Sequence, residues 1–397
     1  MSELIDKIKS LSESYFEEIL AIRRHIHANP ELSFEEHNTA EFIEQKLKEF
    51  GITGVKRIAK TGVTFCLEGK SPGKTIALRA DIDALPIVEE NEVSYKSRNE
   101  GVMHACGHDV HTANLLGVAK ILSGLTEHFN GTIKFIFQPG EEKSPGGASI
   151  LIKEGILENP TPSAILGQHV MPLILTGKVG FRKGKYMASA DEVYLTVKGK
   201  GGHAAMPENF VDPIAIASQI IVSLQQVVSR MANPKTPSVL SFGKISGGQV
   251  NNVIPDEVKI DGTFRTFDEE WRKVAHQRIR DIATAIATSM GGFCEVEMAP
   301  GYPYLVNDEA YTERNIEAAK TYMGEENVVE LDLWMAGEDF SFYTHQVPGC
   351  FYRLGTRNEA QGITSGVHSP TFNIDEEALK TGMGLMAYLA IHELNAD

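Results

Sequence analysis

Short apolar segments alternate with helical ones up to Phe181, and this alternation restricts the fold more than any other feature of the chain. Strands are predicted at Thr75–Ala80, Thr132–Phe137, Ala164–Gly167 and Lys178–Phe181. Helices are predicted around them: an N-terminal one that ends near Asn29-Pro30, then residues 112–122 and 148–157. A further helix should begin after Ser33, which can cap it together with Glu36, and end at Gly51. Strands that alternate with helices indicate an α/β layer with a mixed, mostly parallel sheet.

The middle of the chain has a different order of elements. A strand, a helix, two strands, a helix and a strand are predicted at Glu192–Lys198, Pro213–Met231, Val239–Ile245, Val258–Phe267, Trp271–Met290 and Phe293–Met298. This is the β-α-β-β-α-β order of a ferredoxin-like unit. Helical and strand-like segments resume after Asn307 and finish in a helix at Glu376–Leu394. We therefore expect residues 186–299 to form a smaller domain, inserted into a discontinuous larger domain of residues 1–185 and 300–397.

Composition excludes several classes of protein. A chain of 397 residues favours two domains. Its formal net charge of −15 argues against nucleic acid or an anionic membrane as partner. The sequence has no run of about 20 apolar residues that would cross a bilayer, and its charged N-terminal segment lacks the apolar core of a signal peptide. Four cysteines without a CxxC pair suit a reducing cytoplasm, and we expect Cys66, Cys294 and Cys350 to be small buried hydrophobes.

The segment Met103–Asp109 has the sequence Met-His-Ala-Cys-Gly-His-Asp and falls in a turn between a predicted strand and a predicted helix. Cys106 and His108 are two residues apart, so both side chains can point to the same side of this turn. A thiolate and an imidazole are good ligands for a borderline-soft divalent metal. The alternative interpretation is a helix N-terminus with a buried cysteine and a capping histidine.

Two adjacent carboxylates, Glu141 and Glu142, follow the predicted strand that ends at Phe137 and the turn residues Pro139-Gly140. Neighbouring side chains on a turning backbone point in different directions, so one could bind a metal while the other faces a substrate. Two solvated glutamates are the alternative. Beside a metal site, however, a carboxylate base is what metal-assisted hydrolysis requires.

Two single histidines occupy similar places. His169 ends a predicted strand, and His368 comes just ahead of the last helix. A lone histidine at such a position is more often a hydrogen-bonded structural residue. Several such clusters on one chain favour a shared site, because α/β proteins place their ligands where strands end. The set that suits two adjacent cations is Cys106, His108, Glu142, His169 and His368.

Two acids follow the strand at Thr75–Ala80. Asp81 and Asp83 are spaced so that both face one way on an extended backbone. They could be metal ligands, hydrogen-bond partners that orient a ligating histidine, or residues of a simple turn. For Asp83 we favour the orientation of a histidine, and Asp81 stays open.

The inserted segment carries its own polar residues: His203 in a glycine-rich loop, Asn252 and Arg265. A histidine in such a loop could be inert. It could also donate a hydrogen bond to an oxyanion if a domain or a subunit closes over the site.

Taken together, these segments resemble the aminoacylase and carboxypeptidase family of dinuclear metallopeptidases, and within it the N-acyl-amino-acid amidohydrolases related to hippurate hydrolase and auxin-conjugate hydrolases. The likeness spans nearly the whole chain. It rests on the ordered segments Arg23–Glu31, Arg79–Pro86, His104–Asp109, Gln138–Glu142, His169–Pro172, Gly201–Pro207, Asn252–Pro255, Gly337–Phe340 and His368–Pro370.

The resemblance implies an enzyme that removes the acyl group from N-acyl-L-amino acids with two divalent cations. It implies Glu141 as general base and the metal ligands Cys106, His108, Glu142, His169 and His368. His203 would reach the site of the partner subunit in a homodimer or higher oligomer assembled through the inserted lid domain. Asn252 and Arg265 would lie near the carboxylate or carbonyl of the substrate. Glu208 stands where the group often has histidine, which leaves that loop open.

Three questions stay open at this level. Thiolate and imidazole ligands favour zinc, while carboxylates and water would also accommodate manganese, cobalt or nickel. A carboxypeptidase or dipeptidase could use the same metal chemistry on short peptides. A metal-dependent binding protein without turnover is the third possibility, although a base beside the ligands would have no use in it.

Overall fold

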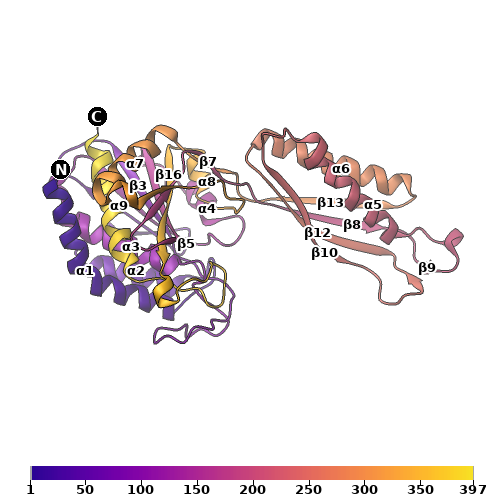
Figure 1. Ribbon diagram of the computed structural model, residues 1–397, viewed down its shortest axis with the longest axis horizontal. Helices are drawn as coiled ribbons and strands as arrows, with labels where there is room; N and C mark the ends of the chain where they lie inside the picture. Colours follow the sequence, from indigo (N-terminus) through magenta and orange to yellow (C-terminus); the bar gives the residue numbers. More distant parts are fainter. Residues whose placement is uncertain (1, 397) are drawn as a thin grey trace. The chain divides into compact units, whose positions relative to one another are not determined.

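A mixed eight-stranded sheet lies at the centre of the larger of two compact units (Figure 1). The computed structural model describes residues 2–396. The strand order is β1-β2-β4-β3-β5-β16-β6-β15. The strand bounds are β1 Lys56–Ile58, β2 Gly62–Glu68, β3 Thr75–Asp81, β4 Thr132–Gln138, β5 Ala164–Leu175, β6 Val179–Phe181, β15 Val328–Glu330 and β16 Gly349–Arg357. The predicted α/β class with a mixed sheet is confirmed.

The four central strands are parallel. β3 pairs in parallel with β4 and β5, and β16 pairs in parallel with β5, whereas β2 and β6 join the sheet antiparallel. All seven residues of β3 are buried, as expected for a strand covered on both faces. The register places Asp81 opposite Gln138 and Arg79 opposite Gly167. The carboxyl ends of β3 and β4 therefore meet at one edge of the sheet, level with the middle of β5.

Helices cover this sheet. Their bounds are α1 Ser2–Ala28, α2 His37–Glu49, α3 His108–Ser123, α4 Gly147–Lys153, α7 Glu309–Met323, α8 Ser341–Thr344 and α9 Ala378–Asn395. α1, α3 and α9 pack against one another, and Figure 1 shows α1 and α9 side by side. The residues of α3 from His108 to Ala119 are all buried, so this helix is held on every side.

The chain divides into two compact units, each with its own hydrophobic core. The first comprises Met1–Tyr186, Val306–Asp332 and Asp339–Asp397, and the second Met187–Leu305 and Leu333–Glu338. The short strands β7 Gly184–Met187 and β14 Leu305–Asn307 fall at two of the four places where the chain passes from one unit to the other. The segment Leu333–Glu338 was not predicted to join the second unit. It does so because Ala188 N–H donates to the Trp334 carbonyl at 3.0 Å.

The second unit is an antiparallel four-stranded sheet, in the order β10-β12-β8-β13, with two long helices (Figure 1). The bounds are β8 Asp191–Lys198, β9 Gly202–His203, α5 Pro213–Gln226, β10 Ser238–Ser246, β11 Val253–Ile254, β12 Glu257–Thr266, α6 Glu269–Ser289 and β13 Phe293–Pro300. Asp212 and Asp268 cap α5 and α6, since their carboxylates accept backbone N–H groups of the first turns.

Two sequence predictions about these elements need correction. Ser33 does not cap a helix: α2 begins at His37, and the Ser33 hydroxyl donates instead to Asp83. Cys66 is exposed on β2 rather than buried, while Cys294 and Cys350 are buried as expected. Pro213–Met231 is, among residues 2–396, the one helical segment long and apolar enough to cross a bilayer, and 28 % of its apolar 18-residue window is buried. Length and composition alone are weak grounds for such a span.

Candidate metal centre

The turn that carries Cys106 and His108 is built around Gly107. This glycine has φ +84°, and a Cβ atom on it would lie 2.6 Å from the Val170 side chain. Only glycine fits such a close, left-handed position. α3 begins directly at His108, so Cys106 and His108 flank the turn, and both are buried.

The turn after β4 carries the two glutamates. Gly140 has φ +61°, and a Cβ atom on it would meet the Phe34 ring at 2.2 Å. Its carbonyl accepts from Gly147 N–H at 2.9 Å, which closes the turn. Glu141 is 6 % exposed, and the Glu142 side chain is 11 % exposed. Two solvated glutamates, the alternative from the sequence, are therefore excluded.

The two single histidines occupy different kinds of backbone. His169 lies inside β5 rather than at its end, because β5 continues to Leu175. Its Nδ1 donates to the Val170 carbonyl at 2.8 Å, which leaves Nε2 for the site. His368 lies in a loop ten positions before α9, with φ +61°. Its N–H donates to the Ala105 carbonyl at 2.7 Å and ties this loop to the Cys106 turn.

The five predicted ligands come together in space. Potential ligand atoms of Cys106, His108 and His169 lie within 4.8 Å of one another, and so do those of Cys106, Glu142 and His368. The Cys106 thiol is thus common to both groups. We call these residues the five-residue cluster: Cys106, His108, Glu142, His169 and His368.

Asp83 lies directly behind the cluster. One of its carboxylate oxygens is 3.1 Å from Nδ1 of His108, and the other accepts from the Glu142 N–H at 3.0 Å. Asp81 is engaged elsewhere: it is 2.5 Å from Nδ1 of His111 and accepts from Nη1 of Arg79 at 2.7 Å. The sequence did not decide the role of Asp81. In the structure its carboxylate contacts the buried side chains of Arg79 and His111.

The electrostatics of the cluster are those of a site built for cations. Burial raises the pKa of the Cys106 thiol well above its ordinary range, and the charges of Glu142 and Glu141 raise it further. Burial alone would lower the pKa of His108, but the carboxylates of Asp81 and Asp83 raise it to about 10. This excess of negative charge calls for positive charge in the cluster.

The surroundings of a buried atom of the cluster also indicate a cation site. Within residues 2–396, Nε2 of His108 is buried and takes part in no hydrogen bond. It lies 3.9 Å from Oε1 of Glu142, and Nε2 of His368 lies 3.2 Å from the same oxygen. Buried polar atoms are nearly always paired, so Nε2 of His108 needs a ligand on the side of the cluster. Thiolate, imidazole and carboxylate are the donors that zinc and similar divalent ions take. The residues present therefore fit a pair of metal ions.

Two residues of the first unit were assigned no role from the sequence. The Asp339 carboxylate accepts from Arg79 Nη2 and from Gln138 Nε2, each at 2.8 Å, and from the Ala148 N–H at 2.9 Å. The Asp339 N–H donates to Glu141 at 3.4 Å. Arg79 in a buried strand was the available signal, because a buried guanidinium needs carboxylate partners.

His203 and Asn252 lie together in the second unit. His203 is exposed on β9 and pairs with Val253 of β11. The Ala204 N–H donates to the Asn252 carbonyl at 3.1 Å. Glu208 lies nearby in sequence, on an exposed turn where it accepts from Asn209.

Arg265 lies near the opposite end of β12. Its Nε donates to the Thr263 hydroxyl at 3.0 Å. Asn252 precedes β12, which starts at Glu257, and from that start to Arg265 the strand runs roughly 25 Å at about 3.3 Å per residue.

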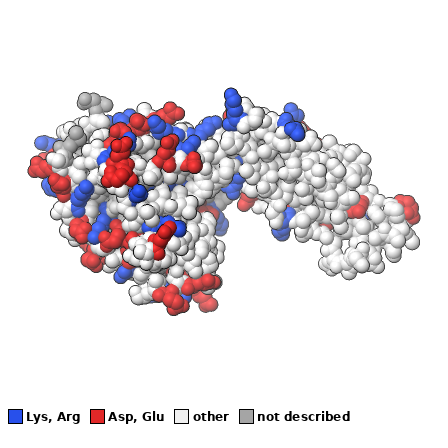
Figure 2. Space-filling view, viewed as in Figure 1, with Lys and Arg blue, Asp and Glu red and all other residues white. Residues whose placement is uncertain are grey.

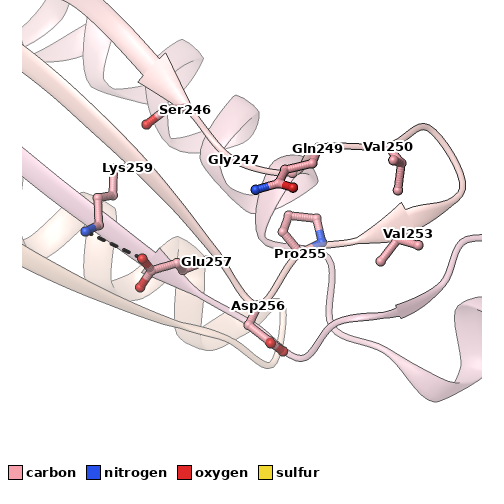
Figure 3. A pocket seen from close by; sticks show the side chains of 10 residues that line it. Ser246, Gly247, Gln249, Val250, Val253, Pro255, Asp256, Glu257 and Lys259 are labelled. Carbon is pink, nitrogen blue, oxygen red and sulfur yellow. Dashed lines mark ion pairs between the residues drawn. The ribbon is translucent and has the colours of Figure 1, made fainter.

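A surface hollow of about 600 Å³ lies beside the loop that leads to Asn252 (Figure 3). Val250 and Val253 line it and are 58 % and 51 % exposed. A Glu257–Lys259 ion pair of 3.5 Å lies on its other side. The hollow contains none of the metal-ligand types of the five-residue cluster apart from carboxylates, so it is not a second centre of this kind.

Comparison with known proteins identifies the family. The family model described as Peptidase family M20/M25/M40 matches residues 77–392. N-acetyl-L-cysteine deacetylase of Bacillus subtilis is 44 % identical over 362 residues, which cover 91 % of this chain and 85 % of the relative. Thermostable carboxypeptidase 2 of Saccharolobus solfataricus is 38 % identical and covers 98 % of both chains.

A solved structure extends the likeness to three dimensions. The Bacillus subtilis YXEP protein, described as a dinuclear metal-binding peptidase from the M20 family, superimposes with a TM-score of 0.83 at 36 % identity. The match covers 97 % of this chain and 100 % of that one.

Proposed function

Because the chain belongs to peptidase family M20/M25/M40 and is a metal-dependent amidohydrolase, we propose that it removes the acyl group from N-acyl-L-amino acids. The observation that carries the proposal is the convergence of two potential ligand groups on one shared thiol, Cys106. Glu141, a carboxylate beside this cluster, completes what hydrolysis of an amide requires.

The five-residue cluster would hold two divalent cations, and Cys106 belongs to both groups of potential ligands. Such cations polarise a carbonyl oxygen and lower the pKa of a water molecule toward about 7. We propose zinc, because a thiolate and imidazoles are its preferred ligands, with manganese, cobalt or nickel as the other candidates. Asp83 would fix the ring of His108 so that Nε2 faces the cation.

Glu141 is the residue that would move the proton. Its carboxylate lies within 4.8 Å of the potential ligand atoms of His108 and Glu142. It is nearly buried, and the Asp339 N–H holds one of its oxygens. We propose that this carboxylate takes a proton from the attacking water and delivers it to the amide nitrogen as the C–N bond breaks.

The second unit would act as a ferredoxin-like lid and dimerisation domain, and the first as the catalytic domain. The β-α-β-β-α-β order and the strand order β13-β8-β12-β10 support the ferredoxin-like assignment. We propose that His203 and Asn252 reach the metal centre of the partner subunit, where His203 donates to the developing oxyanion. Arg265 would bind the carboxylate of the substrate, a task that suits its fork of N–H groups.

The surface of the second unit supports a homodimer. β10 is the edge strand of its sheet, and Val239 and Ile245 on it are 37 % and 54 % exposed. Ile214 and Val222 of α5 are 41 % and 67 % exposed. Figure 2 shows charged side chains gathered on the first unit and few on the visible face of the second. An open sheet edge beside exposed apolar residues is typical of a surface that a partner covers.

Of the two alternatives, only the peptidase has specific support. A relative named thermostable carboxypeptidase favours the cleavage of short peptides with the same site. A binding protein without turnover is disfavoured, because Glu141 would serve no purpose in it. We place the enzyme in the cytoplasm, since its cysteines form no disulfide framework.

The proposal is tested with purified protein loaded with zinc or manganese. Metal content is measured first, and then the turnover of N-acetyl and N-benzoyl amino acids is compared with that of a dipeptide series. We expect about two cations per chain and a higher kcat/KM for the acylated amino acids. Faster hydrolysis of dipeptides would establish the peptidase alternative. No turnover of any amide by metal-loaded protein would refute both enzymatic functions.

A further inference from the structure

The segment Glu31–Glu36, between α1 and α2, runs behind two turns of the metal centre. Its first contact is with the turn after β3: Ala84 N–H donates to the Glu31 carbonyl at 2.8 Å. Next, the Ser33 hydroxyl donates to the Asp83 carboxylate at 2.6 Å. The same carboxylate is the one that orients His108, so this segment already holds one part of the site in place.

The other end of the segment holds the turn of the two glutamates. The Glu36 side chain is fully buried. Its Oε1 accepts from the Gly140 N–H and from the Phe34 N–H, both at 2.8 Å. Its Oε2 accepts from the Thr61 hydroxyl at 2.7 Å. Gly140 directly precedes Glu141, so the Glu36 carboxylate is hydrogen-bonded to the backbone that positions Glu141.

Phe34 supports the same turn by packing. Its backbone has φ +68°, a conformation that residues other than glycine rarely adopt. The Phe34 ring fills the place where Gly140 would carry a Cβ atom. The Phe34 N–H points to Oε1 of Glu36, the oxygen that also receives the Gly140 N–H. Side chain, ring and turn are therefore locked together by one carboxylate oxygen.

Burying the Glu36 carboxylate costs free energy. Within residues 2–396, Glu36 forms no ion pair with a lysine, arginine or histidine. Burial and the charge of Asp83 raise the pKa of Glu36 to about 7. A neutral or apolar residue would be cheaper to bury if only packing were needed. The carboxylate therefore indicates a role in accepting hydrogen bonds from the Gly140 and Phe34 N–H groups.

We propose that Glu36 is a positioning residue of the reaction: its Oε1 fixes the Gly140 turn and thereby sets the position of the Glu141 carboxylate relative to the five-residue cluster. This inference rests on the proposed function, because it assigns Glu36 a role through the proposed base. The alternative is that Glu36 only stabilises the start of α2.

Two substitutions distinguish the effect of the position of the Glu36 oxygens from that of the carboxylate charge. Glu36→Gln keeps an oxygen at the distance of Oε1 and removes the charge, whereas Glu36→Asp keeps the charge and withdraws both oxygens from Gly140. We expect E36Q to retain kcat within about 3-fold and E36D to lose about 10- to 100-fold, both with unchanged metal content and KM within about 2-fold. Thr61→Val is the matched control. It removes the bond to Oε2 only, so it should lower Tm without changing kcat.

A double substitution tests whether Glu36 acts through Glu141. In an E141Q background the base is already lost, so adding E36D should lower kcat by less than about 2-fold. An equal loss in both backgrounds, or loss of metal from E36D, would overturn the inference. So would a wild-type kcat in E36D, or a T61V variant as slow as E36D.

An assay of the wild-type enzyme in parallel distinguishes failure of the proposed function from failure of the role of Glu36. Wild-type protein that holds its metals and hydrolyses no amide would refute the proposed function, and the role of Glu36 with it. An active wild type with a fully active E36D would overturn the role of Glu36 alone.

Discussion

The Cys106 thiol lies 3.4 Å from Nε2 of His169, although 63 positions separate the two residues in sequence. The proximity depends on Gly107, which lets the turn press against Val170, the neighbour of His169 on β5. The same thiol also belongs to the group with Glu142 and His368. Cys106 is therefore the residue on which both halves of the metal centre depend.

Replacing Cys106 should disrupt both halves at once. We expect C106S to lose at least one of its cations and to lower kcat by at least about 100-fold, because a neutral hydroxyl is a much poorer ligand than a thiolate. Metal analysis and an acyl-amino-acid assay on the same sample measure both effects. Cys294 is a buried thiol of the second unit, so C294S is the control for thiol loss. Full metal content and full activity in C106S would refute the shared-ligand assignment.

Glu141 and its neighbour Glu142 should behave differently on neutralisation. E141Q should keep its cations and lose about 10²- to 10⁴-fold in kcat, since general-base catalysis contributes that much. E142Q should lose metal, because Glu142 belongs to the cluster. Metal content and kcat of the two variants are compared under one set of conditions. Exchanged outcomes would show that the two roles are assigned the wrong way round.

The orientation of His108 by Asp83 has a measurable consequence. D83A leaves Nδ1 of His108 without its carboxylate and also removes the acceptor of the Glu142 N–H. Loss of such a partner typically costs 10- to 100-fold in metal affinity. Competition with a chelator measures that affinity directly. An unchanged affinity in D83A would mean that burial alone holds the ring of His108.

Much of the fold could be predicted because periodicity reports burial locally. β3, predicted from six apolar-rich positions, is a strand buried on all its residues, and the first helix ends as expected before Pro30. Ser33 shows where this reasoning fails. A serine followed by a glutamate at three positions is a local helix signal, but the Ser33 hydroxyl finds Asp83 across 50 positions. No local pattern reveals such a partner.

The candidate site, like the fold, could be predicted from the sequence only where local residue types suffice. Residue types and turns sufficed to nominate the five-residue cluster, because metal chemistry restricts the donors. Glu36 was noticed only as part of a capping signal, since its bonds to Gly140 and Thr61 depend on tertiary structure. The separation of Asn252 and Arg265 along β12 likewise became visible only once the strand had its bounds.

That separation leads to a test of the partner subunit's contribution. E141Q and H203A should each be nearly inactive. In a mixed dimer of the two, one site combines an intact Glu141 from one chain with an intact His203 from the other. Random mixing of a two-fold dimer should therefore restore about a quarter of the wild-type activity. Co-expression with two different tags provides the mixed species. Restoration close to zero would place His203 in the site of its own chain.

Glu36 should also leave a signature in stability. Burial and the charge of Asp83 raise its pKa from 4.5 to about 7 in the folded protein, so the folded state binds this proton more tightly than the unfolded state. The stabilisation is complete below about pH 4.5 and is lost as the pH rises through about 7. Glutamine does not titrate. Relative to E36Q, the free energy of unfolding of the wild type should therefore fall by about 3 kcal/mol over this range.

Chemical unfolding of chelator-treated protein at several pH values measures this difference, because removal of the cations keeps their binding out of the comparison. Thr61→Val serves as the control, since it removes a neighbour of Glu36 and leaves the titrating carboxylate. T61V should keep a pH dependence close to that of the wild type. A constant difference between wild type and E36Q from pH 4.5 to 7 would mean that Glu36 is charged throughout, and that its three hydrogen bonds outweigh the cost of burial.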